Sequence, residues 1–422
     1  MRVLVVGNGG REHALLWKLA QSPRQPELFA APGNAGTVSL ATNIAAAADD
    51  VEAVVQEVHR RQVDLTIVGP EAPLVAGIVD RFRAEGLRVF GPTQAAAQIE
   101  ASKAFCKLLM RRAGVPTADF EVFDNAAAAK AYVRQRGAPI VVKADGLAAG
   151  KGVVVAQTEE EALTAIEDMM VQRVFGEAGD RVVIEDCLSG QEVSVFCFTD
   201  GQHVTPLVAA CDYKRAFDGN RGPNTGGMGG YSPPTFWSGE LERTLRQQCI
   251  EPVIRELGRA GTPYTGVLYG GLMLTSAGPH VIEFNARFGD PEAQLVLPRL
   301  ETDLLDVVDA VIDRTVNSLG LRWTTQATVG VVLASGGYPG AIETGKRISG
   351  VDTPTESALA FHAGTAMKDG DVVTAGGRVM AVVGRAATHA EARAIAYGAA
   401  GRIHFEGMHH RSDIAEFAAA PA

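Results

Sequence analysis

The sequence predicts a multidomain protein of the α/β and α+β classes that begins with a doubly wound α/β domain. Its 422 residues exceed what one hydrophobic core usually holds, so two to four domains are expected. Over the first part of the chain, to about residue 100, buried-strand signals alternate with helix signals. Farther along, β-branched runs and glycine-rich turns predict α+β segments, and residues 327–422 are again rich in strand signals and glycine.

The amino-terminal domain is expected to start with a strand, a glycine turn and a helix. The apolar run at residues 2–6 ends in Gly7-Asn8-Gly9-Gly10, and a helix should follow to about residue 20. A nicotinamide dinucleotide binds such turns, but the acidic residue expected after the second strand is absent. A phosphate at the helix amino terminus fits equally well. The alternation continues with helix 51–61, strand 64–68, helix 73–85 and strand 87–90.

The composition excludes some classes of function. A formal net charge of −10 argues against a general nucleic-acid binder, which needs a basic face. The five cysteines are scattered and form no C-x-x-C pair, which is typical of reduced thiols in a cytoplasm. Because the chain shows no signal-peptide pattern and no apolar run of membrane-spanning length, a cytoplasmic protein without a membrane partner is expected.

A glycine-rich segment, residues 142–152, lies between two predicted strands at residues 139–142 and 153–155. A P-loop would need Ser or Thr after Gly150-Lys151 and then a helix, whereas Gly152 and a strand follow. The segment is therefore predicted to be a flap between antiparallel strands. Its backbone N–H groups and lysines could hold phosphates, and an ordinary hairpin with a solvated lysine is the alternative.

Residues 211–231 are predicted to form a long irregular loop, because they show no periodicity and are dense in glycine and charge. Loops of this length are usually functional or disordered. The backbone after Asn224 could wrap a small polar substrate. Just upstream, the acidic residues of segment 184–192 could face a cleft as a hinge, or could simply connect two strands.

A predicted strand at residues 281–287 carries Glu283, Asn285 and Arg287 at alternate positions, so the three side chains should share one face. Two oxygen donors at this spacing suit Mg²⁺, which takes few protein ligands together with substrate phosphates. The guanidinium one step along suits a carboxylate. The alternative is the exposed face of an edge strand, although asparagine is unfavourable in strands.

Two further features are expected to have ordinary structural roles. Lys107 lies in a helix predicted over residues 102–113, and helical lysines are usually solvated. Gly69-Pro70-Glu71 follows a strand at a position where α/β sheets often bind ligands, but a plain loop start is the favoured interpretation.

Five stretches, in order along the chain, resemble the ATP-grasp ligases and, within them, the glycinamide ribonucleotide synthetase family. They read GNGGREH (7–13), GPEAPL (69–74), KADGLAAGKG (143–152), GPNTGGMG (222–229) and IEFNARFGDPE (282–292). The likeness runs essentially end to end, and five motifs in the right order are far more specific than any single one.

The resemblance implies four parts and an ATP-dependent reaction. The parts are an amino-terminal α/β domain (1–101), an ATP-grasp core (102–120 and 187–325), an ATP-grasp lid (121–186) and a carboxyl-terminal α+β domain (326–422). The implied reaction joins glycine to 5-phosphoribosylamine through glycyl phosphate, with ATP as co-substrate and Mg²⁺ or Mn²⁺ as cofactor, in de novo purine biosynthesis. A monomer that binds neither nucleic acid nor membrane is expected.

The resemblance also implies roles for individual residues. ATP would contact Lys103, Lys143, Gly146, Gly150, Lys151, Gly152, Glu185, Leu188 and Glu192, with Glu185 and Leu188 at the adenine and Glu192 at the ribose. Glu283 and Asn285 would hold the metal. Glycine and phosphoribosylamine would meet Gly9, Gly10, Asn224, Thr225, Gly226, Gly227 and Arg287. Arg287, Asp212 and Lys143 are the implied catalytic residues.

Two departures from the family pattern are visible. Cys187 stands in the hinge where a bulkier apolar residue is expected, and Tyr269-Gly270-Gly271 occupies the region where many ATP-grasp enzymes carry another acidic metal ligand. Two rival functions remain at this point. One is a nicotinamide dehydrogenase built on residues 1–100, and the other is a ligand-binding regulator without catalysis, against which the intact set of Lys143, Glu283 and Asn285 argues.

Overall fold

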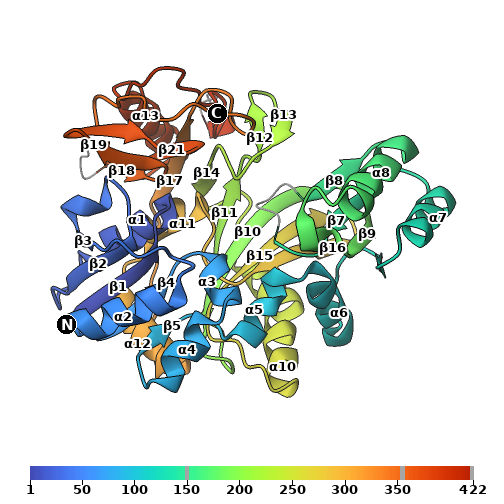
Figure 1. Cartoon of the computed structure of the whole chain (residues 1–422), viewed down its shortest axis with the longest axis horizontal. Helices are drawn as coiled ribbons and strands as arrows, with labels where there is room; N and C mark the ends of the chain where they lie inside the picture. The colour runs from blue at the N-terminus through green and yellow to red at the C-terminus, as the bar shows by residue number, and fades with distance from the viewer. Residues whose placement is uncertain (148–151, 352–356, 419–422) are drawn as a thin grey trace.

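The computed structural model describes residues 1–147, 152–351 and 357–418. Its strands form sheets of five, eight and four strands and two short two-stranded ribbons. Figure 1 shows the four-stranded sheet and its helices standing apart from the carboxyl-terminal strands, with the amino-terminal sheet on the other side of the molecule. The α/β and α+β multidomain class predicted from the sequence is confirmed.

The amino-terminal sheet is parallel, in the order β3-β2-β1-β4-β5. Leu4 and Val6 point into one hydrophobic core, whereas Val3 and Val5 point into another. Residues 3–6 of the first strand are all apolar because both faces of the sheet are covered. The elements are β1 (Arg2–Gly7), α1 (Gly10–Leu19), β2 (Glu27–Pro32), β3 (Thr42–Asn43), α2 (Val51–Arg61), β4 (Leu65–Val68), α3 (Glu71–Val75), α4 (Ile78–Ala84) and β5 (Val89–Phe90).

The helix predicted at residues 73–85 is two helices. Helix α3 ends at Val75, and α4 begins after Gly77, whose φ of 88° is left-handed. A helix cannot continue through that conformation, and glycine adopts it without a Cβ penalty. The break turns Glu71 of α3 toward the centre of the molecule, where Arg287 contacts it.

The four-stranded sheet has the order β6-β9-β7-β8 and a hydrophobic core of its own. Strands β7 and β8 are antiparallel and flank the glycine segment, as predicted. The helix predicted at residues 158–171 is α-helical only to Ile166 and continues as a π-helical turn. The elements are β6 (Phe120–Phe123), α7 (Ala126–Arg136), β7 (Ile140–Ala144), β8 (Val153–Ala156), α8 (Glu159–Ile166) and β9 (Val182–Asp186).

The eight-stranded sheet runs in the order β16-β15-β10-β11-β14-β17-β21-β18. Its strands are β10 (Gln191–Thr199), β11 (Val208–Asp212), β14 (Gly229–Ser232), β15 (Gly266–Thr275), β16 (Gly278–Asn285), β17 (Ala327–Ala334), β18 (Ala358–His362) and β21 (Arg378–Ala386). The sequence predicts a domain boundary near residue 326. Strand β14, before this boundary, pairs with β17, after it, so backbone hydrogen bonds join the two predicted domains. The carboxyl-terminal segment therefore extends the central sheet.

Two local predictions are wrong. Segment 211–231 is not one irregular loop, because β12 (Arg215–Phe217) and β13 (Arg221–Asn224) pair as a hairpin within it. The turn between them carries Asn220 and Gly219 at positive φ, which allows the tight reversal. The strand predicted at residues 281–287 ends at Asn285, so Arg287 lies in the bend that follows.

The remaining helices pack on these sheets. They are α5 (Gln94–Ala101), α6 (Lys103–Ala113), α9 (Gly239–Leu245), α10 (Glu251–Arg259), α11 (Glu292–Val296), α12 (Leu304–Ile312) and α13 (His389–Ala400), and a ribbon joins β19 (Thr365–Lys368) to β20 (Asp371–Thr374). Among the described residues, no helix combines the length and apolarity needed to cross a membrane.

Candidate active site

A buried carboxylate flanked by two lysines lies where the four-stranded sheet meets the core. Glu185 on β9 forms ion pairs with Lys143 on β7 and with Lys107 on α6. Burial opposes the charged carboxylate, but the two lysines outweigh burial and lower the pKa of Glu185. Lys107 is buried, donates to Thr117 Oγ1 at 2.6 Å and is not solvated, so the surface position expected for it is wrong. In this structure the Glu185 side chain holds these lysines in place.

The base of the glycine flap is tied to the start of α6 through Asp145. Its Oδ1 accepts from Ser102 Oγ at 2.9 Å and from the Ala104 amide at 2.7 Å, and its Oδ2 accepts from Arg181. Lys103 Nζ donates to the Gly146 carbonyl at 3.1 Å, and burial lowers the pKa of this lysine. The flap residues Gly150 and Lys151 lie outside the described residues, whereas Gly152 accepts from the Ala144 amide at 2.8 Å.

Glu283 on β16 is the carboxylate around which the cations of the site gather. Burial raises its pKa, but Lys214, Lys143 and Lys103 overcome that effect, and the pKa lies below its ordinary value. Lys143 Nζ also approaches the carbonyl of the adjacent Ile282 at 3.4 Å. Lys103 of α6, Lys143 of β7 and Lys214, which lies between β11 and β12, therefore bring positive charge to one acidic residue.

The donor set at Glu283 and Asn285 fits a divalent cation. Within the described ranges, no hydrogen-bond donor or ion-pair partner lies within bonding distance of the Glu283 carboxylate. The Asn285 Oδ1 accepts only a long bond, 3.4 Å, from Arg287 Nη2. One carboxylate and one amide oxygen with spare capacity suit Mg²⁺, which keeps waters and substrate phosphates as its other ligands. The described residues contain no cluster of three or more His, Cys, Asp or Glu side chains suited to a metal.

Arg287 joins the amino-terminal domain to the core. Its Nε donates to Glu71 Oε2 at 3.0 Å, and its Nη2 donates to Glu100 Oε1 at 2.5 Å. Glu100 Oε2 also accepts from the Ala286 amide at 2.7 Å. Burial opposes ionisation of Glu71, yet Arg287 and Arg11 lower its pKa to about 2. In this conformation the guanidinium meets two protein carboxylates, so its assignment to the glycine carboxylate stays a prediction.

A second polar cluster is formed by Glu292 at the start of α11 and by residues of the neighbouring strands β10, β11 and β15. Buried Glu292 accepts from Tyr269 Oη at 3.0 Å, and that hydroxyl also contacts Ser194 Oγ at 2.9 Å. Burial and the Asp212 carboxylate raise the pKa of Glu292 to about 7. Burial likewise raises the pKa of Asp212, although Lys214 beside it acts in the opposite direction. Tyr269, in the stretch where the family pattern carries another acidic residue, thus directs its hydroxyl at the Glu292 carboxyl group.

Residues 224–227, which are expected to contact the substrates, are held by hydrogen bonds to Lys214 and from Arg378. Thr225 donates from its amide and its hydroxyl to the Lys214 carbonyl at 2.7 and 2.8 Å. Arg378 of β21 donates to the carbonyls of Gly226 and Asp290. Gly227 has a φ of 112°, and an added Cβ there would lie 2.5 Å from Pro291 Cδ. Asn224, at the end of β13, is exposed.

The amino terminus of α1 already has acidic partners. The Gly9 amide donates to Glu12 Oε2 at 2.6 Å, and the Arg11 amide donates to Asp290 Oδ2 at 3.1 Å. An added Cβ at Gly10 would lie 2.3 Å from Gln294 Nε2. These contacts leave little free space beside Gly9 and Gly10, and the phosphate-binding role of the two glycines stays a prediction.

The hinge residues lie at the edge of the site. Leu188 and Cys187 are partly exposed, and Glu192 is exposed and accepts from Lys214 Nζ at 3.0 Å. Glu192 therefore reaches the same lysine that lies near Glu283 and Asp212. A contact of these side chains with adenine or ribose stays a prediction.

Sequence reasoning missed the partners that come from distant segments. Glu71, Glu100, Lys214, Glu292 and Arg378 were assigned no role in the site. Four of them have a local signal in the sequence, namely the GPEAPL and GDPE stretches, a lysine two residues after Asp212, and the Gly-Gly-Arg378 run, whereas Glu100 has none. A single sequence gives no sign of which distant segments will meet.

Comparison with known proteins decides the family. The chain matches the N domain of phosphoribosylglycinamide synthetase at residues 1–100, its ATP-grasp (A) domain at residues 101–293 and its C domain at residues 328–417. The chain belongs to the phosphoribosylglycinamide synthetase family. The resemblance found in the sequence motifs is thereby confirmed.

Similar proteins extend over nearly the whole chain. Proteins named phosphoribosylamine–glycine ligase from Halalkalibacterium halodurans and Ralstonia nicotianae are each 50% identical over 98% of this chain, and the matches cover 96% and 98% of those proteins. The crystal structure of the Thermotoga maritima phosphoribosylamine–glycine ligase has a TM-score of 0.83 and 34% identity, covering 98% of this chain and all of that one. A biotin carboxylase from Campylobacter jejuni has a TM-score of 0.74 at 14% identity, covering 97% and 92%, and shows the shared fold alone.

Proposed function

We propose that this phosphoribosylglycinamide synthetase family member joins glycine to 5-phosphoribosylamine with ATP, giving glycinamide ribonucleotide, ADP and phosphate in de novo purine biosynthesis. The observation that carries the proposal is the convergence of Lys103, Lys143 and Lys214 on Glu283, beside Asn285. Such an arrangement neutralises a polyphosphate and a transferring phosphoryl group. Relatives that are 50% identical over 98% of the chain carry the corresponding name.

The first step is activation of glycine. A carboxylate oxygen of glycine attacks the γ-phosphorus of ATP, the bond to the β–γ bridging oxygen breaks, and ADP leaves. Lys143 and Lys103, held by Glu185 and by the Gly146 carbonyl, supply positive charge beside the phosphoryl group. The chain contributes position and charge to this step, with no covalent intermediate on the protein.

The second step forms the amide. The amine nitrogen of phosphoribosylamine attacks the carbonyl carbon of glycyl phosphate, phosphate leaves, and the nitrogen gives up a proton. Asp212, whose pKa is raised by burial, is the carboxyl group proposed to take that proton, and Glu292, whose pKa is raised to about 7, is its neighbour. The lid, when closed, would keep water away from the acyl phosphate.

Glu283 and Asn285 would hold the divalent cation. When bound, Mg²⁺ or Mn²⁺ supplies charge neutralisation at the phosphates. In this proposal the adenine lies at the hinge near Glu185 and Leu188, and the ribose lies near Glu192. The catalytic groups are Lys143, Asp212 and Arg287, and the substrate segments are Gly9–Gly10 and residues 224–227.

The proposed domain division is the one that the resemblance to the ATP-grasp ligases implies. Residues 1–101 form the amino-terminal domain, residues 102–120 and 187–325 the core, residues 121–186 the lid and residues 326–422 the carboxyl-terminal domain. The separate hydrophobic core of the lid supports its treatment as one moving unit. We further propose that the chain acts as a monomer in the cytoplasm.

The direct test is an ADP-release assay with glycine and freshly made phosphoribosylamine, added separately and together. ADP should form in quantity only when both are present. ADP release that neither substrate stimulates would contradict the ligase assignment. A nicotinamide-dependent hydride transfer would instead favour the dehydrogenase, and saturable ligand binding without turnover would favour the regulator.

A further inference from the structure

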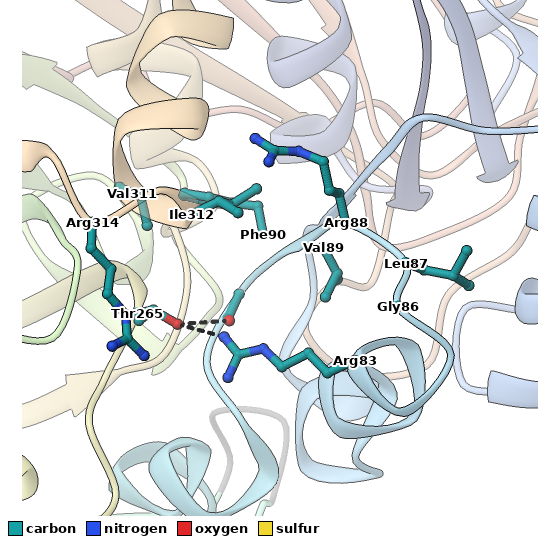
Figure 2. A pocket seen from close by; sticks show the side chains of 11 residues that line it. Arg83, Gly86, Leu87, Arg88, Val89, Phe90, Thr265, Val311, Ile312 and Arg314 are labelled. Atoms are coloured by element: carbon teal, nitrogen blue, oxygen red, sulfur yellow. Dashed lines mark hydrogen bonds between the residues drawn. The ribbon is translucent and has the colours of Figure 1, made fainter.

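A pocket of about 370 Å³ lies at the junction of the amino-terminal domain and the core, and none of Lys143, Glu283 and Arg287 lines it. One wall is the segment from Arg83 to Gly91, which contains β5, and the other is formed by Thr265 and the end of α12. Figure 2 shows that Arg83 and Arg314 come from opposite walls and extend toward Thr265. The two arginines therefore flank one opening.

The pocket is lined by cations on its rim and apolar side chains on its floor. Val89, Phe90 and Val311 are buried, and no acidic residue is among the described residues that line the pocket. Arg88 is already neutralised, because it forms ion pairs with Asp309 at 2.8 Å and Asp313 at 2.9 Å. Its guanidinium points away from the other two in Figure 2.

Arg83 and Arg314 differ from Arg88 in having no carboxylate partner among the residues that the structure describes. Arg83 Nη2 donates to Thr265 Oγ1 at 3.1 Å, and this hydroxyl donates to the Gly91 carbonyl at 3.3 Å. These bonds orient the Arg83 guanidinium and leave most of its donors unused. The guanidinium groups of Arg83 and Arg314 thus offer positive charge and hydrogen-bond donors to the pocket, and no carboxylate among the described residues pairs with either of them.

The backbone at Arg314 adds an independent observation. Its φ of 58° is left-handed, at the position after a helix where glycine is most favourable. Arginine adopts this backbone conformation less easily than glycine, but it places a cation at the pocket rim. The local backbone alone does not favour this residue type.

We propose that this pocket binds a phosphate monoester with an apolar or aromatic body. Guanidinium groups match phosphate oxygens in forked geometry, and arginine also stacks on flat rings. The floor formed by Val89, Phe90, Val311 and Ile312 would contact the body of the ligand. The volume lies in the range of pockets for small organic molecules. The proposal is independent of the ligase reaction, because the pocket is lined by none of the residues assigned to it.

The test is calorimetric titration of the full chain with its ATP site saturated by a non-hydrolysable ATP analogue, Mg²⁺ and glycine. The probes are phenyl phosphate, adenosine 5′-monophosphate and inorganic phosphate. Both organic phosphates should bind, and each more tightly than inorganic phosphate, because only they contact the apolar floor. The Arg83→Gln/Arg314→Gln double variant should bind them at least about tenfold more weakly.

Two further variants separate binding from folding. Arg134→Gln, on exposed α7 of the lid, removes one positive charge elsewhere and should leave affinity unchanged. Arg314→Gly suits the left-handed backbone, so it should keep or raise the melting temperature while weakening phosphate binding. Absence of saturable binding while the ATP site is filled, or equal affinity in the double variant, would overturn the proposal. Equal affinity for phenyl phosphate and inorganic phosphate would overturn the apolar part.

Discussion

Single residues in the candidate site are set by partners far away in the sequence. Arg287 contacts Glu71 and Glu100, which lie 216 and 187 positions earlier in the chain. The alternation of Glu283 and Asn285 on a strand was predictable, because strand side chains alternate between faces. The pairing of Arg287 with buried Glu100 and partly buried Glu71 was not predictable, because it depends on how separate domains pack.

Glu283→Ala should reduce kcat at least about 100-fold while leaving the fold intact, because the variant loses the carboxylate that faces the lysines and would hold the cation. Steady-state ADP release at saturating Mg²⁺ measures the effect, and circular dichroism checks the fold. Glu240→Ala, an exposed acidic residue on α9, is the matched control. A Glu283→Ala enzyme with near-normal kcat would remove the metal assignment.

Arg287→Lys should lower kcat/KM for glycine by roughly 30- to 150-fold, because lysine cannot reproduce the forked geometry of a guanidinium. The dissociation constant for ATP should change little. Since the same guanidinium pairs with Glu100, Glu100→Gln is the informative comparison. If Glu100→Gln reproduces the whole loss, Arg287 acts by positioning. If Arg287→Lys weakens ATP binding but leaves kcat/KM for glycine unchanged, Arg287 does not bind the glycine carboxylate.

Glu292→Gln should change the pH dependence of stability. The pKa of Glu292 is raised from 4.5 to about 7 by burial and by Asp212, so folding favours its protonated form. The stabilising effect of this carboxyl group is therefore complete below about pH 4.5 and is lost as the pH rises through 7. Relative to wild type, Glu292→Gln should gain stability between pH 5 and pH 8, measured by urea unfolding at both pH values. A difference that does not change with pH would contradict the raised pKa.

At the scale of elements, local sequence signals predicted those structures that depend on near neighbours. Strands β7 and β8 and helix α7 lie where apolar periodicity and glycine turns placed them. The β12–β13 hairpin escaped prediction because its strands are only three and four residues long and lie mostly at the surface, too short to show a sustained alternation of polar and apolar residues. The end of α8 differs because a π-helical turn replaces the last α-helical residues, a change without a sequence signal.

Nucleotide binding should slow amide hydrogen exchange at Gly146 and Gly152, the described flanks of the flap. The Gly146 amide donates only a long bond, 3.3 Å, to the Ala178 carbonyl, so phosphate contacts would add protection. Exchange is measured with and without a non-hydrolysable ATP analogue. The buried Val142 amide of β7 is the internal control and should not change. Equal exchange at the two glycines in both states would count against the lid as the phosphate-binding part.

At the scale of the whole molecule, the sequence predicted the multidomain architecture but not how its parts join. The central sheet continues through β14 and β17 into the carboxyl-terminal segment, so the two share one sheet across the expected boundary. This continuity brings β21 and its Arg378 to Gly226 and Asp290. Asp290 in turn accepts from the Arg11 amide at the start of α1. One arginine thus links the carboxyl-terminal segment to the region where the amino-terminal domain meets the core.

Arg378→Gln should separate this linking role from nucleotide chemistry. The substitution removes the cation beside Asp290 and weakens the contacts that hold Gly226, while the four-stranded sheet keeps its own hydrophobic core. Because the contacts are to the segment expected to hold phosphoribosylamine, KM for that substrate should rise about tenfold or more, with the ATP dissociation constant unchanged. Arg402→Gln, an exposed arginine at the end of α13, serves as the control and should leave both values unchanged. A KM for phosphoribosylamine that stays at its wild-type value, in a variant that folds normally, would show that the carboxyl-terminal segment takes no part in forming the substrate site.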